Sequence, residues 1–242
     1  MKTFRYAHRG LHDLSAGIPE NSLAAFRRAA GRGFGAELDV HLLSDGTLAV
    51  FHDSKLERLT GREGFIEDLT AADLPQLKLA GTGETVPQLH EVLELFDRAK
   101  LPLLVELKAF RGNHNELTER TVRELDKYLV PYVIESFDPR CLLWLRRNRP
   151  EIIRGQLAQD FLHGDSSGMG HKVDLILTHM AYNPATRPNF VSYRFEDRNT
   201  PALRRVKRLK TAVIFYWTIR SREDMELAEA DGAQVIFEGF IP

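Results

Sequence analysis

The sequence is poor in several features that would each define a class of protein. Among its 242 residues only Cys141 is a cysteine, which excludes an intramolecular disulfide and a cysteine metal cluster. No apolar run approaches the roughly 18 residues of a membrane-spanning helix, and no apolar signal segment precedes His8, so the expected location is the cytoplasm. The net charge of −1 gives no electrostatic reason to expect nucleic acid or an anionic membrane as a partner.

The most informative stretch that is present is Glu37-Leu38-Asp39-Val40-His41. Side chains alternate faces along a strand, so the two carboxylates and the histidine share one face while the aliphatic residues share the other. Burying unpaired carboxylates is costly, because a charge loses its hydration. Two acids at this spacing therefore indicate a cation between them. A solvated face on an edge strand is the alternative.

Short apolar runs alternate with amphipathic segments along the whole chain. The predicted strands are 4–8, 36–42, 48–51, 102–107, 131–135, 152–157, 173–177, 190–193, 212–217 and 234–237. The predicted helices are 21–31, 87–98, 114–128, 139–147, 200–208 and 221–230. In the first of these helices, Asn21 is the predicted N-cap and Gly31 and Gly33 mark the end.

Repeated βα units imply a parallel sheet with right-handed crossovers, and eight of them close into a (β/α)8 barrel of about 250 residues. The sequence therefore predicts an α/β protein whose residues 1–242 form one barrel. A doubly wound open sheet is the rival fold, but no glycine-rich dinucleotide loop follows the first strand. Residues 53–86 are the least regular part and are predicted to be a small insertion between barrel units.

Six short motifs follow one another in order along the chain. They are His8-Arg9-Gly10, Pro19-Glu20-Asn21-Ser22, Glu37-Leu38-Asp39, Asp45-Gly46, His52-Asp53 and Val105-Glu106-Leu107-Lys108. Together they resemble the glycerophosphodiester phosphodiesterase family, and the resemblance covers nearly the whole chain. The candidate catalytic residues recur at the carboxyl ends of separate predicted strands, where barrels carry their active sites.

The chemistry of these side chains suits the hydrolysis of a phosphodiester. Glu37, Asp39 and Glu106 offer only oxygen ligands, which favour Mg²⁺ or Ca²⁺ over zinc. His8 and His52 can exchange protons near neutral pH. The remaining two positive groups are suited to a phosphate: Arg9 presents a planar fork, and Lys108 a point charge beside the third acid.

The resemblance implies the same roles at the matching positions. His8 and His52 are expected to be the general acid and base, Glu37, Asp39 and Glu106 the metal ligands, and Arg9 and Lys108 the groups around the phosphate. It also implies that a glycerophosphodiester is split into glycerol 3-phosphate and an alcohol. Phe137 and Trp217 match family positions that approach or line the substrate pocket, although a helix start and a buried core are their alternative interpretations. Whether water or a substrate hydroxyl attacks stays open.

Other residues near the motifs have two possible roles. His41 could be an extra ligand, but a supporting role behind the ligands is favoured, and Asp53 either orients His52 or begins a loop. His163 and His171 are interpreted as exposed loop residues. The chain departs from the family pattern at Arg220 and in the ending Phe237-Glu238-Gly239-Phe240-Ile241-Pro242. These departures concern substrate specificity more than catalysis.

Two other functions are consistent with the same residues. One is a phospholipase-type phosphodiesterase on the same barrel, which would need exposed apolar loops to reach a bilayer. The other is a module that binds a phosphorylated ligand without turnover. Two histidines beside three acids argue against simple binding, because binding requires no proton transfer.

Overall fold

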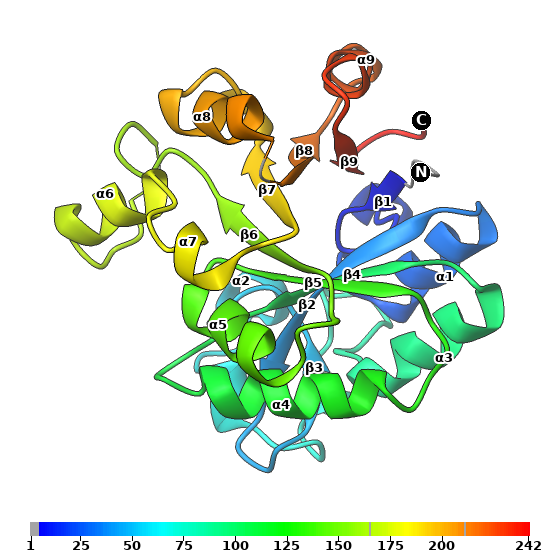
Figure 1. The fold of residues 1–242 in the computed structure, drawn as a ribbon. Coiled ribbons are helices and arrows are strands. Elements are labelled where there is room, and N and C mark those ends of the chain that lie inside the picture. Colours follow the sequence, from blue (N-terminus) through cyan, green and yellow to red (C-terminus); the bar gives the residue numbers. More distant parts are fainter. Residues whose placement is uncertain (1–4, 165, 211) are drawn as a thin grey trace. The chain divides into compact units, whose positions relative to one another are not determined.

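The structure is a computed structural model that describes residues 5–164, 166–210 and 212–242 (Figure 1). The chain forms two compact units, one ending at Val133 and the other covering Ile134–Pro242, and each is described by itself. The first predicted strand begins at residue 4, which lies outside the described residues. Among the described helices, none combines the length and the apolar character needed to cross a bilayer.

The N-terminal unit is built on three parallel strands, β1 (Arg5–Ala7), β2 (Gly35–Leu42) and β4 (Leu103–Leu107), with β2 pairing to both of the others. A fourth strand, β3 (Leu48–Val50), returns antiparallel to β2 and pairs Val50 with Val40. The helices of this unit are α1 (Leu23–Gly31), α3 (Leu89–Ala99) and α4 (His114–Leu125). A short 3-10 turn, η1 (Leu14–Ala16), precedes α1.

Strand β2 is the centre of this unit, and all eight of its residues are buried. Its aliphatic side chains Leu38 and Val40 are fully buried, as expected for a strand between two neighbours in a barrel-type sheet. The acidic side chains on the other face are also buried, with Glu37 2% and Asp39 1% exposed. The alternative of a solvated edge strand is therefore wrong, and the two charges require compensation inside the protein.

The insertion predicted at 53–86 is present and has a small core of its own. It holds a short helix α2 (Glu57–Thr60) and two 3-10 turns, η2 (Ile66–Asp68) and η3 (Leu74–Gln76). Its buried hydrophobic residues pack with the β2–β3 hairpin in one cluster, formed by Leu43, Ala49, Phe51, Leu56, Leu59, Ile66, Leu74, Leu77, Leu79 and Val86. The segment is thus anchored to the strand that carries two of the acids.

The C-terminal unit continues the alternation of strands and helices. Its strands pair in parallel in the order β5 (Tyr132–Ser136, which begins in the first unit), β6 (Arg154–Ala158), β7 (Phe190–Arg194), β8 (Val213–Ile219) and β9 (Gln234–Phe237). Its helices are α5 (Pro139–Asn148), α6 (His171–Thr178), α7 (Asn183–Thr186), α8 (Pro201–Leu209) and α9 (Arg222–Ala230), with a 3-10 turn η4 (Phe195–Asp197). In the described part of the chain, eight parallel strands thus alternate with helices, and β3 is the antiparallel addition.

One predicted strand is wrong, because residues 173–177 lie inside helix α6. The sequence Val-Asp-Leu-Ile-Leu is apolar and too short for its periodicity to distinguish a strand from a helix. The helix also buries Asp174 and Thr178 while exposing Leu175 and Ile176, which is the reverse of the usual amphipathic pattern. The sequence of residues 171–178 therefore lacks the apolar stripe that would have predicted a helix.

Candidate active site

The three predicted ligands come together in the N-terminal unit. Glu37 and Asp39 lie on β2, and the parallel register places Asp39 opposite Glu106 of β4. One carboxylate oxygen from each residue lies within 4.8 Å of the others, and all three side chains are buried. Parallel strands in register therefore collect the acids that the alternation along the sequence placed on one face.

Asp39 is the most strongly supported of the three acids. Its Oδ2 accepts a hydrogen bond from Asn21 Nδ2 at 2.8 Å, and Lys108 Nζ lies 3.0 Å from its Oδ1. Burial raises the pKa of Asp39, but the nearby charges of Lys108, His52 and Arg9 outweigh burial and hold that pKa well below its usual range. Asp39 is therefore ionised in the folded protein.

Glu106 has the opposite character although it touches the same lysine. Its Oε1 lies 2.7 Å from Lys108 Nζ. Burial raises the pKa of Glu106 to about 7, and the attraction of Lys108 only partly opposes that effect, while the charge of Asp39 adds to it. The same pair of acids raises the pKa of Lys108 against the effect of burial. Lys108 therefore supplies one positive charge to two buried acids, and a second cation would complete the balance.

The donor set fits a hard divalent cation. Asp39 Oδ1 is buried and accepts no hydrogen bond, although Lys108 lies beside it as an ion-pair partner. Oxygen atoms from three carboxylates within 4.8 Å provide the ligand type that Mg²⁺ and Ca²⁺ prefer. The residues present are thus compatible with the predicted metal site.

Asn21 has a different role from the one predicted. Helix α1 begins at Leu23, and its N-cap is Ser22, whose side chain accepts a hydrogen bond from the Ala25 amide. Asn21 lies before the cap in the left-handed region, at φ 52°, with its side chain bonded to Asp39. Asparagine tolerates this backbone region better than most residues, which leaves its amide free to reach the site.

The turn after β1 brings His8 and Arg9 to the acids. His8 Nε2 lies 4.0 Å from Glu37 Oε2, and the Arg9 backbone amide donates to the same oxygen at 2.9 Å. The Arg9 guanidinium donates to Glu20 at 2.7 Å and lies 3.6 Å from Asp39. Gly10, at φ 76°, completes the turn where a Cβ would come within 2.8 Å of the Ala25 Cβ.

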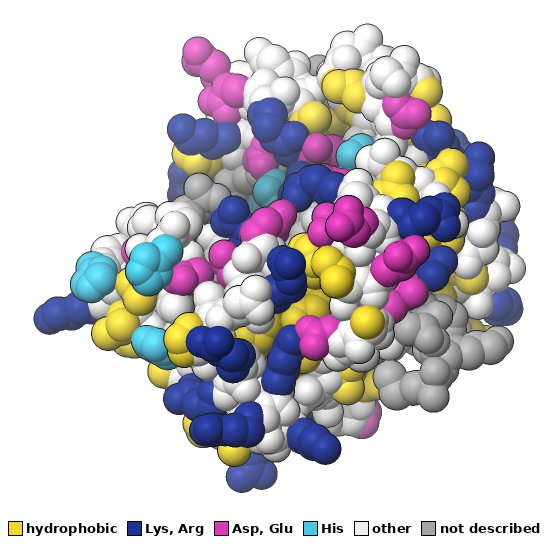
Figure 2. Space-filling model, turned by 90° about the horizontal axis from the view of Figure 1, so that it is seen from above, with side chains coloured by type: hydrophobic (Ala, Val, Ile, Leu, Met, Phe, Trp, Pro, Cys, Tyr) yellow, Lys and Arg dark blue, Asp and Glu magenta, His cyan; other side chains and the backbone are white. Residues whose placement is uncertain are grey.

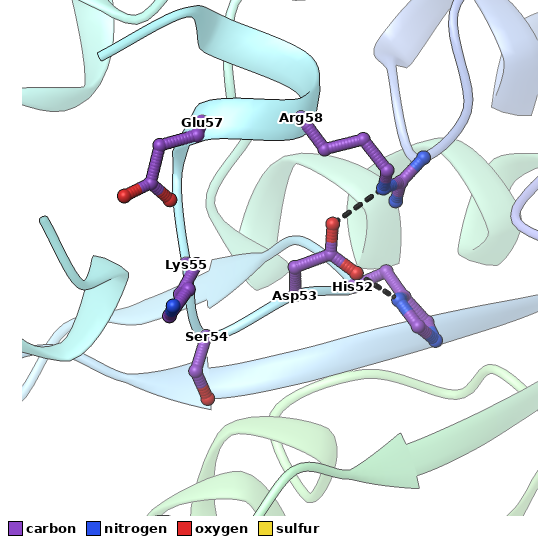
Figure 3. Close-up of a pocket in the computed structure, with 6 residues that line it drawn as sticks. All are labelled: His52, Asp53, Ser54, Lys55, Glu57 and Arg58. Carbon is purple, nitrogen blue, oxygen red and sulfur yellow. Dashed lines mark hydrogen bonds and ion pairs between the residues drawn. The ribbon is translucent and has the colours of Figure 1, made fainter. Parts of the chain in front are cut away.

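The second candidate acid–base residue, His52, follows β3 and contacts the insertion (Figure 3). Its Nδ1 lies 2.5 Å from Asp53 Oδ1, and Asp53 in turn accepts from Arg58 of α2. Burial lowers the pKa of His52, Lys108 adds to that effect, and Asp53 opposes it. The observed bond supports the interpretation that Asp53 orients His52. These side chains line a pocket of about 580 Å³ together with Ser54, Lys55 and Glu57.

Arg58 joins the residues around His52 to those around Arg9. It donates to both carboxylate oxygens of Glu20, at 2.9 and 2.7 Å, while Glu20 also accepts from Arg9. Burial raises the pKa of Glu20, but the two arginines outweigh it and lower that pKa to about 2. A continuous series of hydrogen bonds and ion pairs therefore runs from His52 to Arg9, by way of Asp53, Arg58 and Glu20.

His41 contacts two protein groups instead of pointing to the acids. Its Nδ1 lies 2.7 Å from Glu67 Oε1 and its Nε2 lies 3.1 Å from the His52 carbonyl oxygen. Ser54 donates to the same Glu67 oxygen at 2.9 Å. His41 thus supports the segment around His52, as favoured from the sequence. Glu67, Glu20 and Arg58 were not predicted, because their partners lie far away along the chain.

The two predicted aromatic residues lie in the C-terminal unit. The rings of Phe137 and Trp217 meet edge to face with centroids 5.8 Å apart, and Phe161 packs on Phe137 in the same way. Arg220, where the chain departs from the family pattern, pairs with Glu238 at 2.9 Å and with Glu196 at 3.4 Å. Two histidines were interpreted from the sequence as exposed loop residues. His163 is exposed and pairs with Asp160, while His171 begins α6 and so is not a loop residue.

Comparison with known proteins identifies the family. The model of the glycerophosphoryl diester phosphodiesterase family matches residues 8–240, which lie in both units. A glycerophosphodiester phosphodiesterase of Caldanaerobacter subterraneus subsp. tengcongensis is 31% identical over 236 residues, which is 93% of this chain and 89% of that protein. The corresponding protein of Bacillus altitudinis is 33% identical over 168 residues, or 65% and 67% of the two chains. The chain therefore belongs to the glycerophosphoryl diester phosphodiesterase family and is an enzyme of the phosphoric diester hydrolase class.

Solved structures confirm the fold class predicted from the sequence. A phosphodiesterase of Oleispira antarctica, solved with the product sn-glycerol-3-phosphate, matches 97% of this chain and 92% of its own, with a TM-score of 0.80 and 24% identity. A glycerophosphodiester phosphodiesterase of Thermotoga maritima matches 98% and 95% of the two chains, with a TM-score of 0.71 and 25% identity. The fold is that of a (β/α)8 barrel.

Proposed function

We propose that this enzyme hydrolyses glycerophosphodiesters to glycerol 3-phosphate and an alcohol, with one divalent cation as cofactor. The observation that carries the proposal is the cluster of Glu37, Asp39 and Glu106, within 4.8 Å of one another in a member of this family. A purely structural role would not require three buried acids, of which two share one lysine.

The three acids are the proposed ligands of Mg²⁺ or Ca²⁺. When bound, the cation supplies positive charge that neutralises the non-bridging phosphate oxygens. Lys108 adds a fixed positive charge at the same acids, 3.0 Å from Asp39 and 2.7 Å from Glu106. Arg9, held between Glu20 and Asp39, presents a guanidinium that can turn one edge to the phosphate.

His8 and His52 are the proposed general acid and base. One removes a proton from the nucleophile, either water or a substrate hydroxyl, and the other returns a proton to the leaving alkoxide oxygen. His52 suits such a role because Asp53 fixes its ring at 2.5 Å and because burial lowers its pKa, which keeps the imidazole neutral near neutral pH. The backbone amide of Arg9 fixes Glu37 Oε2, which is the acid oxygen next to His8.

Phe137 and Trp217 are proposed to contact the substrate. Their edge-to-face contact leaves parts of both side chains accessible, since neither residue is fully buried. Residues 1–242 are proposed to form one catalytic domain. Substitution of either aromatic residue by alanine should raise KM more than it lowers kcat if the ring contacts substrate in the ground state.

The test is release of glycerol 3-phosphate by the purified chain with Mg²⁺, Ca²⁺ or Mn²⁺. The substrates are glycerophosphocholine, glycerophosphoethanolamine, glycerophosphoinositol and glycerophosphoglycerol. Absence of release from every one of them would refute the proposed activity. Faster turnover of phospholipid in liposomes than of any soluble diester would instead support the phospholipase alternative.

A substitution separates catalysis from simple binding. His52→Ala should lower kcat by about 10²–10⁴-fold while the affinity for the diester stays nearly unchanged. The matched control is His163→Ala, since the side chain of His163 is 82% exposed and pairs with Asp160 three residues earlier. If His52→Ala reduced affinity and turnover equally, a binding module would be the better description.

A further inference from the structure

Helix α6 buries polar residues and exposes apolar ones, which is the opposite of the usual arrangement for a surface helix. Its polar residues Asp174 and Thr178 are 5% and 4% exposed, whereas Leu175 and Ile176 are 44% and 37% exposed. Surface helices normally bury their apolar stripe and expose their polar one. The helix therefore presents aliphatic side chains to the solvent, which is unfavourable unless a partner covers them.

Hydrogen bonds of the buried polar residues fix this orientation. Asp174 accepts from the Ser166 hydroxyl at 2.8 Å and from the Ser167 amide at 2.9 Å. The Thr178 hydroxyl oxygen accepts from the Phe161 amide at 3.0 Å. Turning the helix to bury Leu175 would break all three bonds, so the apolar exposure is built into the local structure.

Neighbouring apolar residues enlarge the exposed area. Met169, just before α6, is 64% exposed, and Tyr182, just after it, is 47% exposed. We call Met169, Leu175, Ile176 and Tyr182 the α6 patch. Within residues 166–187 the exposed charged side chains are Lys172 and Arg187, while the one acidic residue of this segment, Asp174, is buried.

Helix α8 continues the positive charge of this surface. The Arg205 guanidinium donates to the His179 carbonyl oxygen at 3.0 Å, which ties α8 to the end of α6. Residues 201–210 contain five basic residues and no acid, namely Arg204, Arg205, Lys207, Arg208 and Lys210. With Lys172 and Arg187 the two segments hold seven basic residues against the buried Asp174, in a chain whose net charge is −1; of the seven, Lys207 is paired with Asp231.

We propose that the α6 patch and the basic residues of α8 form a docking surface for an anionic phospholipid bilayer. Aliphatic and tyrosine side chains enter the boundary between head groups and acyl chains, while lysine and arginine attract anionic head groups. The left part of Figure 2, where α6 lies in Figure 1, shows hydrophobic side chains exposed among basic and histidine side chains. The near-zero net charge conceals this local excess.

The two rival partners fit the observations less well. A second copy of the chain would bring two basic surfaces together, and like charges disfavour such a contact. A nucleic acid would use the basic residues and could stack a base on Tyr182, but it would leave the aliphatic side chains of Leu175 and Ile176 without an apolar partner. The combination of aliphatic residues and basic charge is typical of interfacial membrane helices.

Flotation with large unilamellar vesicles tests the proposal on the full chain. Vesicles of phosphatidylcholine and phosphatidylglycerol should bind the protein, vesicles of phosphatidylcholine alone should bind it much less, and added salt should weaken the binding. Substituting both Arg204 and Arg208 by glutamine should lower the partition coefficient for the mixed vesicles by about thirtyfold. The double substitution Leu175→Ser and Ile176→Ser should also weaken binding.

Matched controls use the exposed surface of α9. Leu227→Ser removes a leucine that is 50% exposed, and Arg222→Gln removes one exposed charge; both variants should bind like the parent chain. Because all substituted side chains are exposed, thermal unfolding of every variant should match the parent. Absence of binding to mixed vesicles, or equal loss in the α9 controls, would overturn the proposal. Self-association without vesicles that the α6 substitutions abolish would also overturn it. Binding to duplex DNA instead of vesicles, abolished by the same substitutions, would do so as well.

Discussion

Lys108 Nζ lies 2.7 Å from Glu106 Oε1, so the third acid of the candidate metal site is held by a lysine two residues along the same segment. The same nitrogen lies 3.0 Å from Asp39 Oδ1 on the neighbouring strand. One ammonium group therefore serves two buried carboxylates, and we expect both the stability of the protein and the metal affinity of the candidate site to depend on it.

Lys108→Met should destabilise the metal-free protein. The substitution leaves Asp39, which is 1% exposed, without its nearest positive charge. Breaking one side of a buried ion pair costs about 3–5 kcal/mol, which corresponds to a fall in Tm of roughly 6–20 °C for a chain of this size. Calorimetry with and without Mg²⁺ measures the effect, and the cation should restore part of the loss. Arg98→Met, which removes an exposed charge from α3, should change Tm little.

Metal affinity should depend on pH through Glu106, whose pKa burial raises from 4.5 to about 7. The folded protein holds this proton more tightly than the unfolded chain, so the stability it contributes is complete below pH 4.5 and is lost as pH rises to about 7. The cation requires the deprotonated acid, so its affinity should rise by up to about tenfold per pH unit within that window. Titration calorimetry in buffers of different ionisation enthalpy counts the released protons. Glu106→Gln should abolish this proton release, and an unchanged release would assign it to another group.

Asp53→Asn should impair His52 without removing it. The carboxylate at 2.5 Å orients the ring and opposes the fall in its pKa. We expect kcat to fall by about 10–100-fold, less than the 10²–10⁴-fold expected for loss of the imidazole itself. The limb of the pH–rate profile that reports His52 should move to lower pH. Asp68→Asn provides the control, because Asp68 is an exposed acid of the same insertion that pairs with Arg111.

Asn21→Gly should weaken metal binding with little backbone strain. Glycine accepts the φ of 52° at this position, and the substitution removes only the amide that donates to Asp39 at 2.8 Å. Loss of such an outer hydrogen bond typically lowers metal affinity about 10–100-fold. Asn21→Ala should bind metal as weakly and also unfold at a lower temperature, since it adds strain. Equal metal affinity in the parent and the glycine variant would show that the amide is dispensable.

The clustering of the three acids could be predicted because strand periodicity indicates it. Alternation along Glu37 to His41 placed the acids on one face, and a parallel neighbour was enough to bring Glu106 opposite Asp39. The supporting residues could not be found this way. Glu67 contacts His41, which is 26 positions away along the chain, and Arg58 contacts Glu20, which is 38 positions away. No local spacing in the sequence predicts either pair.

The errors in secondary structure have equally local causes. Asn21 and Ser22 are both good N-cap residues, but Ser22 has the extended backbone that an N-cap needs, whereas Asn21 lies in the left-handed region with its amide bonded to Asp39. The strand predicted at 173–177 failed because α6 buries Asp174 and exposes Leu175. In both places a side chain with a tertiary partner overrides the local preference.

The antiparallel pairing of Val40 with Val50 has a consequence for how this protein can change over evolution. The next amide, that of Phe51, donates to the Asp39 carbonyl oxygen at 3.1 Å, so His52 directly follows a residue that is bonded to one of the clustered acids. Sliding this hairpin by a single position would exchange its two faces and carry the imidazole away from the acids. A longer or shorter loop at residues 43–47 is therefore tolerable only when the pairing register of the two strands is kept. We expect the imidazole and the acids to be inherited together for this reason.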